Sequence, residues 1–501
     1  MTSAINPLLL VTFFPLVGVL LILLLGRTGK TAVRWIALLT SLVTFGLSLW
    51  MLSMFNTADG GIQMEINLPW LTLGGNTIGF HLGVDGISIL MVLLTAFLTP
   101  IAILSTWKAV EERVSGFMTF FLLLEMGMMG VFLSLDMVLF YIFWEFTLVP
   151  MYFLIGMWGS QRRVYAALKF VLYTMAGSLL MLAGILWMGL SYGGFDLTQL
   201  SGSAVPLTAQ LWLFGAFGLA FAIKVPMWPL HSWLPDAHTE APTAGSVILA
   251  GVLLKMGAYG FLRFNLPLFP QATLKLAPWM AGLAVIGILY GALVAFRQKD
   301  VKRLVAYSSI SHLGFVVLGT FALTAQGVQG AILQMVNHGL STGALFLIVG
   351  MLYERRHTRQ MSDFGGLWRV VPLMGSLTLI TVLSSAGLPG LNGFVGEFTI
   401  LLGTFNSPIL ASPWFAAIAT LGVILAAVYL LHMFQQVFLG PVTCPENEKL
   451  ADLNPREIII LAPILLLAFW IGFYPKPFFS LISPAVEQLL ALIQTVAQTV
   501  P

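Results

Sequence analysis

Apolar segments, each long enough to cross a lipid bilayer, follow one another along almost the whole chain. A spanning helix needs about 20 apolar residues. Because lipid offers no hydrogen bonds to the backbone, segments of this kind must form helices or closed barrels. Windows of this length predict an all-α, polytopic membrane protein with fourteen spans near residues 7–26, 32–54, 84–107, 115–134, 136–157, 164–192, 208–228, 243–264, 272–296, 301–324, 328–353, 369–407, 412–440 and 456–475. The twelfth is too long for one straight span, so we expect a break within it.

The scarcity of charge supports the same conclusion and excludes several function classes. Charged residues make up 9% of the chain, against about 25% in a typical soluble domain. A net charge of +3 without a basic stripe argues against nucleic-acid binding. The single cysteine, Cys444, excludes an iron–sulfur cluster, a paired-cysteine zinc site or a disulfide framework made by this chain alone. Residues 1–25 lack a basic leader and a cleavage site, so we interpret them as a retained first span.

The basic residues predict the orientation of the chain. Most of the 23 lysines and arginines lie in or beside the loops that follow odd-numbered spans. The positive-inside rule therefore puts these loops in the cytoplasm and both termini on the outer, periplasmic side. We expect the tail 478–500 to form a surface or partner-contact helix. The basic residues on the predicted cytoplasmic side are Arg27, Lys30, Arg34, Lys108, Arg113, Arg162, Arg163, Arg297, Lys299, Lys302, Arg303, Arg355, Arg356, Arg359, Arg369, Lys449 and Arg456.

Two ionisable residues within the predicted spans indicate transport. A charge at the centre of a spanning helix costs at least about 2.5–3.5 kcal/mol, so each one needs a reason. Glu145 has no neutralising residue within one turn of its own helix, so its partner must come from another helix. Lys224 precedes Pro226 and Pro229, which a regular helix interior does not accommodate. We therefore expect the seventh span to break at Lys224, as transporter helices do beside their sites. A structural ion pair that only fixes helix packing is the alternative for Glu145.

Four further residues, Lys255, Glu397, His312 and His338, extend this pattern through the second half of the chain. Lys255 lies between Gly251 and Gly257, and burial there would favour its neutral amine. The alternative is a lysine that only hydrogen-bonds to carbonyl groups. Glu397 follows a run of glycines with Pro389, which marks the expected break in the twelfth span. The run does not have the spacing of a dinucleotide-binding loop.

Histidines in the tenth and eleventh spans complete the set. His312 and His338 are each surrounded by hydroxyl or amide side chains. Imidazole exchanges protons near neutral pH, which fits a relay between lysine and glutamate sites. A structural hydrogen bond is the alternative for either ring. Glu125, Lys169 and His231 are possible accessory residues, and Lys169 lies close enough to the cytoplasmic end to reach water.

The two expected helix breaks indicate an internal repeat. They occupy corresponding positions if spans four to eight and nine to thirteen form two five-helix units, and an odd number of spans makes the second unit inverted. The division is N-terminal helices in 1–114, a first repeat in 115–267, a second repeat in 268–440, and a cytoplasmic loop, last helix and tail in 441–501.

Several stretches resemble a known family. Residues 143–156, around Glu145, are similar to the fifth-helix motif of the antiporter-like, proton-pumping subunits of respiratory complex I. Residues 224–243 resemble that family's most recognisable stretch, and residues 453–457 and 472–477 resemble its M-type (chain 4) branch. The resemblance implies fourteen helices with the seventh and twelfth discontinuous, and an essential pair at Glu145 and Lys224. It also implies a central lysine at Lys255 and a terminal residue at Glu397, where glutamate rather than lysine favours the M-type branch.

The resemblance also implies a function and its partners. We expect a translocase subunit of NADH-quinone oxidoreductase in the bacterial inner membrane, with L-type and N-type neighbours and no redox site of its own. NADH, FMN, iron–sulfur clusters and quinone are then expected in partner subunits. The alternatives are a cation/proton antiporter subunit and a membrane subunit of a hydrogenase-type or photosynthetic relative.

Overall fold

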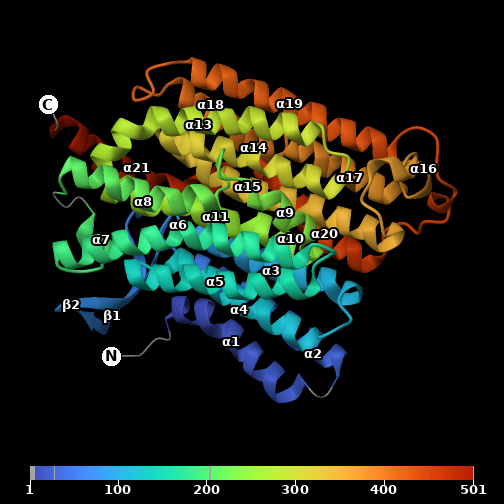
Figure 1. The fold of residues 1–501 in the computed structure, drawn as a ribbon, viewed down its shortest axis with the longest axis horizontal. Helices are drawn as coiled ribbons and strands as arrows, with labels where there is room; N and C mark the ends of the chain where they lie inside the picture. The colour runs from blue at the N-terminus through green and yellow to red at the C-terminus, as the bar shows by residue number, and fades with distance from the viewer. Residues whose placement is uncertain (1–5, 27–28, 202–204, 500–501) are drawn as a thin grey trace.

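The computed structural model describes residues 6–26, 29–201 and 205–499, and shows a bundle of helices whose axes run mostly along its length (Figure 1). The first residues of the predicted retained segment, 1–5, and the basic residue Arg27 lie outside the described residues. Within the described part, fourteen helices are long and apolar enough to cross a membrane. The predicted all-α, polytopic class is confirmed.

The first half of the chain supplies eight of these helices and one small sheet. The bounds are α1 Pro7–Leu25, α2 Lys30–Met54, β1 Gln63–Leu73, β2 Asn76–Val84, α3 Ile89–Ala109, α4 Val114–Leu133, α5 Met137–Trp158, α6 Arg163–Tyr192, α7 Leu197–Leu200, α8 Leu207–Lys224, α9 Trp233–Glu240, α10 Thr243–Ile248, α11 Leu254–Gly260 and α12 Leu266–Leu268. Segments α10 to α12 form one continuous helix that contains π-helical turns at Leu249–Leu253 and Phe261–Asn265.

The second half supplies the remaining long helices and one interrupted helix. The bounds are α13 Pro270–Phe296, α14 Val301–Phe321, α15 Ala325–Arg356, α16 Leu367–Val370, α17 Pro372–Ser385, α18 Asn392–Phe405, α19 Trp414–Phe438, α20 Pro455–Phe473 and α21 Lys476–Thr499, with short 3₁₀ turns at Met361–Asp363 and Pro445–Asn447. The expected twelfth span is thus two helices of 14 residues each, α17 and α18.

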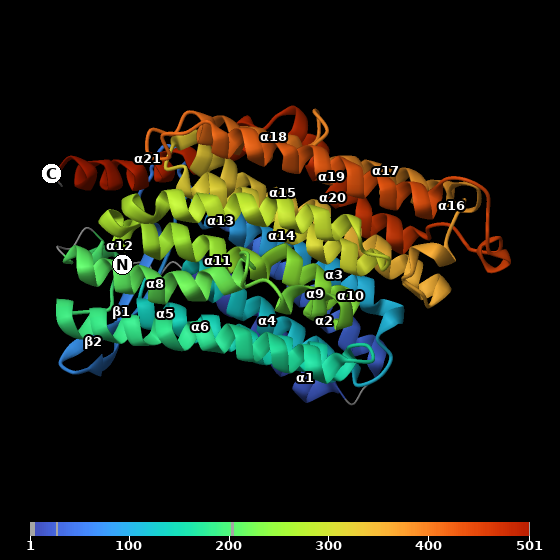
Figure 2. The same ribbon diagram turned by 45° about the horizontal axis from the view of Figure 1, so that its top comes forward.

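The two ends of the bundle differ in character. We call the end that carries the loops 110–113, 159–162, 297–300 and 357–366 the basic end, and the other the hairpin end, because β1 and β2 lie there (Figure 1). Helix α21 is the one qualifying helix that the sequence did not predict as a span. Its Leu481 and Pro484 pack against Gly86 and Gly60 at the hairpin end. It extends along the left of the bundle in Figure 2.

The hairpin was not predicted from the sequence. Strands β1 and β2 pair antiparallel, and their register closes with Leu73 opposite Asn76. The connecting Gly74 and Gly75 have φ values of 58° and 85°, a left-handed conformation that glycine adopts without strain. The side chain of Asn6 donates a hydrogen bond to the Met64 carbonyl, so the beginning of α1 lies at the same end.

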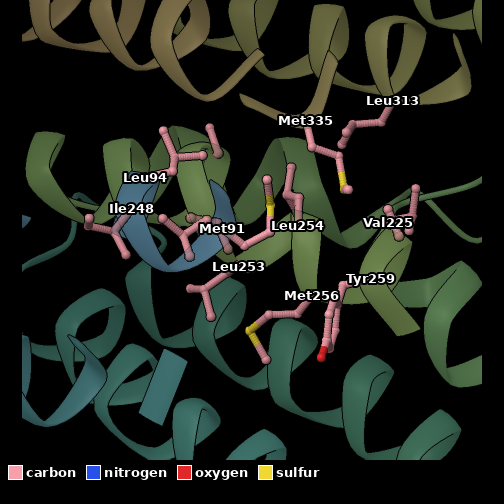
Figure 3. Close-up of a cluster of buried hydrophobic side chains, with 14 of the residues drawn as sticks. Met91, Leu94, Val225, Ile248, Leu253, Leu254, Met256, Tyr259, Leu313 and Met335 are labelled. Atoms are coloured by element: carbon pink, nitrogen blue, oxygen red, sulfur yellow. The ribbon is translucent and has the colours of Figure 1, made fainter. Parts of the chain in front are cut away.

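The centre of the bundle is the continuous helix α10 to α12, which is buried from Ala244 to Leu268. Apolar side chains from several helices surround it, among them Met91, Val225, Leu313 and Met335 (Figure 3). Small residues allow close contact: a Cβ at Gly257 would lie 2.7 Å from the Phe221 carbonyl oxygen of α8. Polar groups on this helix are therefore held far from lipid, where only protein groups or enclosed water reach them.

Candidate functional site

Glu145 and Lys224 face each other across helices α5 and α8. The two side chains interact electrostatically, and Glu145 also interacts with Ser178 of α6. They form no salt bridge within 4 Å, and the ammonium of Lys224 has no hydrogen-bond partner among the described residues. Instead it lies 5.3 Å from the Trp144 ring and 5.4 Å from the Phe170 ring. The pair is therefore open, with its lysine held by aromatic faces.

The break predicted at Lys224 is confirmed. Helix α8 ends at Lys224, and α9 begins at Trp233 after an irregular segment. The indole N–H of Trp233 donates a hydrogen bond of 2.9 Å to the carbonyl of Ile223, which supplies a partner for the backbone at the break. Both Lys224 and Trp233 are fully buried, so the irregular backbone is enclosed by protein.

Lys255 lies in the centre of the bundle and contacts a histidine of another helix. Its fully buried ammonium bonds the Ala250 carbonyl, which lies in the preceding π-helical turn, and the His338 Nδ1 of α15 at 2.6 Å. Wide π-helical turns occur often at functional sites, because they redirect backbone groups. The His338 Nε2 lies on the opposite side of the ring and has no hydrogen-bond partner among the residues that the structure describes.

His312 and Glu397 form the other end of the same cluster. His312 Nδ1 of α14 lies 2.7 Å from the Glu397 Oε1 of α18. The other ring nitrogen lies 3.1 Å from the Tyr429 hydroxyl and 3.4 Å from the Ser385 hydroxyl. The side-chain amide of Gln334 donates a further hydrogen bond of 3.0 Å to Glu397 Oε1. His312 and Glu397 are both buried, so this contact is enclosed by protein.

The break between α17 and α18 is held by amide side chains. Asn337 donates from its side chain to the Asn392 carbonyl at 2.7 Å, and Asn392 donates back to the Asn337 carbonyl at 3.3 Å. The Ser384 hydroxyl donates to the Asn392 side chain. Gly387 and Gly390 have φ values of 79° and 92°, where a side chain would be strained. These contacts fix the helix that presents Glu397.

Four of the predicted residues therefore form one buried row, from Lys255 through His338 and His312 to Glu397. The two imidazole centroids are 6.1 Å apart, a separation that one bridging water spans. Lys224 is not bonded to this row, although its helix packs against α11 at Gly257. The sequence predicted the members of the row, and the structure adds their order and contacts.

The accessory residues have different surroundings. Lys169 of α6 forms a 2.7 Å salt bridge with Asp236 of α9, rather than extending freely toward water. His231 lies in the irregular segment and packs edge-on against Tyr290 at 4.9 Å. Glu125 is fully buried in α4, and neither carboxyl oxygen has a hydrogen-bond partner within the described chain. None of the three joins the row.

Two buried residues that the sequence analysis passed over lie between the row and the basic end. His238 of α9 stacks on Phe346 with centroids 4.6 Å apart, and neither ring nitrogen has a partner among the described residues. Lys302 donates to the Ala241 carbonyl at 2.5 Å and lines a cavity of about 610 Å³ with Thr243 and Arg359. Lys302 lies at the start of the predicted tenth span beside Asp300, which was the available signal, whereas His238 lies between the predicted seventh and eighth spans.

A separate polar cluster ties the hairpin to the bundle. His81 is fully buried and lies 2.8 Å from Glu65 and 2.9 Å from Asp196. Burial alone would lower the pKa of His81, but the hydrogen bonds and charges of the two carboxylates outweigh it, so its pKa is raised. Burial would raise the pKa of Asp196, but its hydrogen bonds to His81 and Thr198 lower it to about 2.

The chain is similar to proteins of one known family over most of its length. The family model described as "NADH:quinone oxidoreductase/Mrp antiporter, TM" matches residues 134–427, more than half of the chain. The chain is 44% identical to NADH-quinone oxidoreductase subunit M of Rickettsia prowazekii, over 97% of this chain and 99% of the relative. It is 43% identical to NADH-ubiquinone oxidoreductase chain 4 of Arabidopsis thaliana, over 95% of each chain.

Solved structures have the same fold. A chain of respiratory complex I from Thermus thermophilus superposes with a TM-score of 0.86 and 35% identity, covering 97% of this chain and 99% of that one. A chain of the Mrp complex from a Dietzia species, at 21% identity and a TM-score of 0.83, covers 99% of this chain and 100% of that one and shares the fold. The chain thus belongs to the membrane-subunit family of NADH:quinone oxidoreductases and Mrp antiporters, within the group of M subunits of NADH-quinone oxidoreductase.

Proposed function

We propose that this subunit moves protons along the row Lys255–His338–His312–Glu397, under the control of Glu145 and Lys224, as quinone is reduced elsewhere in the complex. The observation that carries the proposal is the buried pair of contacts at 2.6 Å and 2.7 Å, joined by two imidazole rings. The chain belongs to a family that includes membrane subunits of NADH-quinone oxidoreductase, and this membership supports a proton-conducting role.

The open pair Glu145–Lys224 is the proposed control element. A carboxylate near the ammonium favours the charged lysine, whereas separation leaves a buried charge that only aromatic faces stabilise. Closing and opening the pair therefore loads and releases a proton at Lys224. One pKa unit corresponds to about 1.4 kcal/mol, so a change of a few units is within reach of the redox reaction.

The row itself carries the proton between helices. The ammonium of Lys255 donates its proton to His338 Nδ1, and the ring releases a proton from Nε2 toward His312. His312 then delivers a proton from Nδ1 to Glu397 Oε1. Each ring accepts at one nitrogen and donates from the other, so no group needs to move far.

The arrangement in the membrane follows from the charge distribution. We infer that the basic end faces the cytoplasm of a bacterial inner membrane and that both termini lie on the periplasmic side. The broken helices, at Lys224 and before Glu397, support two inverted repeats in 115–267 and 268–440. Residues 1–114 and 441–501 would then flank the repeats.

Electron transfer belongs to other subunits in this proposal. A single cysteine provides too few thiolates for an iron–sulfur cluster, so NADH, FMN, clusters and quinone are assigned to partners. The L-type and N-type antiporter-like subunits are the proposed neighbours within the bilayer. A cation/proton antiporter subunit is the second candidate, and the shared fold of the Mrp chain favours it only at the level of architecture.

Proton pumping in membrane vesicles tests the proposal. Lys224→Ala and Glu145→Gln should abolish or strongly reduce NADH-driven acidification of the vesicle interior and slow NADH oxidation. Lys275→Ala is the matched control, because Lys275 is exposed on α13. Unchanged NADH-driven pumping, together with a lost sodium/proton exchange, would replace the proposal with the antiporter.

A further inference from the structure

Lys255 has a second set of neighbours, which points toward the hairpin end rather than along the proposed row. Tyr259 and Arg263 follow Lys255 at intervals of four residues along the central helix, and Arg263 lies in its second π-helical turn. The Nε of Arg263 donates to the Tyr259 hydroxyl at 3.1 Å. The three residues therefore form a column along one buried helix, from its centre to its hairpin end.

The column ends at a cavity. Asp85 and Arg263 line a cavity of about 340 Å³ at the hairpin end, together with Thr198, Ser201 and Gln488. A cavity of this size far exceeds the space that one water molecule needs. At 1.5 Å per residue, Arg263 lies only about 12 Å along the helix from Lys255. The cavity thus comes close to the central lysine.

A similar cavity approaches Lys255 from the other side. The cavity lined by Lys302 and Arg359 reaches Thr243, where the central helix begins, about 18 Å from Lys255 by the same rise per residue. Lys255 therefore lies between two cavities at opposite ends of the bundle. If Lys255 carries protons, one of the two cavities must be separated from it by a barrier. Without that barrier, protons would flow back through the subunit from one side of the membrane to the other.

Tyr259 and Arg263, between Lys255 and the hairpin end, have the properties of such a barrier. The Tyr259 hydroxyl donates its proton to the Phe132 carbonyl of α4 at 2.9 Å and accepts from Arg263. The only proton of the Tyr259 hydroxyl is therefore used in this hydrogen bond and is not donated toward Lys255. A guanidinium stays charged in proteins, so Arg263 neither relays a proton nor tolerates a hydronium ion nearby.

Asp85 holds the guanidinium in place. Its carboxylate accepts from Arg263 Nη2 at 2.5 Å and from the backbone N–H groups of Ile87 and Ser88 at 3.0 and 3.1 Å. The Ser88 hydroxyl donates to the same oxygen at 3.2 Å. Four donors on one carboxylate oxygen leave the ion pair little freedom to open.

We infer that Tyr259, Arg263 and Asp85 form an electrostatic seal that keeps protons of the hairpin-end cavity from Lys255. The seal directs protons on Lys255 sideways to His338, and so toward Glu397. This inference rests on the proposed function, in which Lys255 carries a proton. Arg263 and Asp85 act as positioning residues for the path and do not carry the proton themselves.

Passive proton permeability tests the seal without any redox reaction. The intact complex is placed in proteoliposomes, a pH gradient is imposed without NADH, and the decay of the gradient is measured. Arg263→Gln should speed the decay by about tenfold to a hundredfold, because a fixed like charge a few Å away raises the energy of a hydronium ion by a corresponding amount. Arg263→Lys should restore a slow decay.

Matched variants separate the seal from a general loss of structure. Arg355→Gln removes a similarly buried arginine, paired with Glu457, at the basic end and should leave the decay slow. Adding Lys255→Ala to Arg263→Gln should stop the leak, because the leak passes through Lys255. Asp85→Asn, which keeps the volume of the side chain, should leak as well and serves if Arg263→Gln fails to assemble.

Two results would overturn the seal. One is a decay in Arg263→Gln and Asp85→Asn no faster than in Arg355→Gln. The other is a leak that persists unchanged when Lys255 is also replaced. Neither result depends on NADH-driven pumping, so the seal and the proposed function fail separately.

Discussion

Removal of the His338 ring should stop proton movement while leaving the bundle largely intact. His338→Leu replaces a buried ring with an apolar side chain of comparable size. Among the described residues, Lys255 then keeps only its bond to the Ala250 carbonyl. One lost hydrogen bond to a charged group costs about 1.5–3 kcal/mol, which a large helical bundle tolerates.

The effect of His338→Leu on proton transfer should be far larger than its effect on stability. His338 is the only described side chain that links Lys255 to His312, and the ring centroids of the two histidines are already 6.1 Å apart. A positioned proton-transfer group contributes about 10²–10⁴-fold to the rate of its step. We therefore expect NADH-driven pumping through this subunit to fall below detection, as measured by a pH-sensitive dye in proteoliposomes.

His432→Leu is the control for this experiment. His432 lies in α19, packs on Phe296 and is partly exposed on the surface of the bundle. Its replacement by leucine removes a histidine from another long apolar helix without touching the row. A ratio of protons pumped to NADH oxidised in His338→Leu equal to the His432→Leu value, in complexes assembled to the same level, would refute the relay.

Three further predictions concern the ends of the row and the hairpin. Glu397→Gln keeps the size of the side chain but cannot take up a proton, so proton pumping measured with the same dye should fall as it does for His338→Leu. Asn392→Ala removes bonds that hold the broken helix and should destabilise the subunit by about 1–3 kcal/mol, as followed by thermal denaturation, whereas the exposed Asn406→Ala should not. The contacts of His81 should be strongest between about pH 4 and 6.5: a raised His81 pKa means they weaken as pH rises through it, and a lowered Asp196 pKa means they weaken as pH falls toward 2. Amide hydrogen exchange in the hairpin, corrected for intrinsic rates, should therefore rise at alkaline pH, and His81→Gln should remove that dependence; exchange with the same pH profile in both proteins would contradict it.

Span positions were predictable because each helix must satisfy its own backbone in lipid. The same argument located both broken helices, since prolines and glycines near Lys224 and Glu397 cannot continue a regular helix. The hairpin was missed although Gly74–Gly75 lies between residues typical of strands. The search for apolar windows passes over strands at the membrane surface.

The contacts of the site were beyond the reach of the sequence. His338 is 83 positions from Lys255, and Glu397 is 85 positions from His312. No local pattern encodes which helices lie side by side at such separations. The π-helical turn that brings the Ala250 carbonyl to Lys255 likewise has no sequence signature of its own.

The ratio of protons translocated to NADH oxidised, measured with Lys255→Met, tests the central claim most directly. Lys255 connects the row to the rest of the bundle and is fully buried. The account predicts that the ratio falls, or that oxidation and pumping stop together, while Lys275→Met behaves as the unmodified complex. An unchanged ratio at an unchanged rate of NADH oxidation would show that protons do not pass through Lys255.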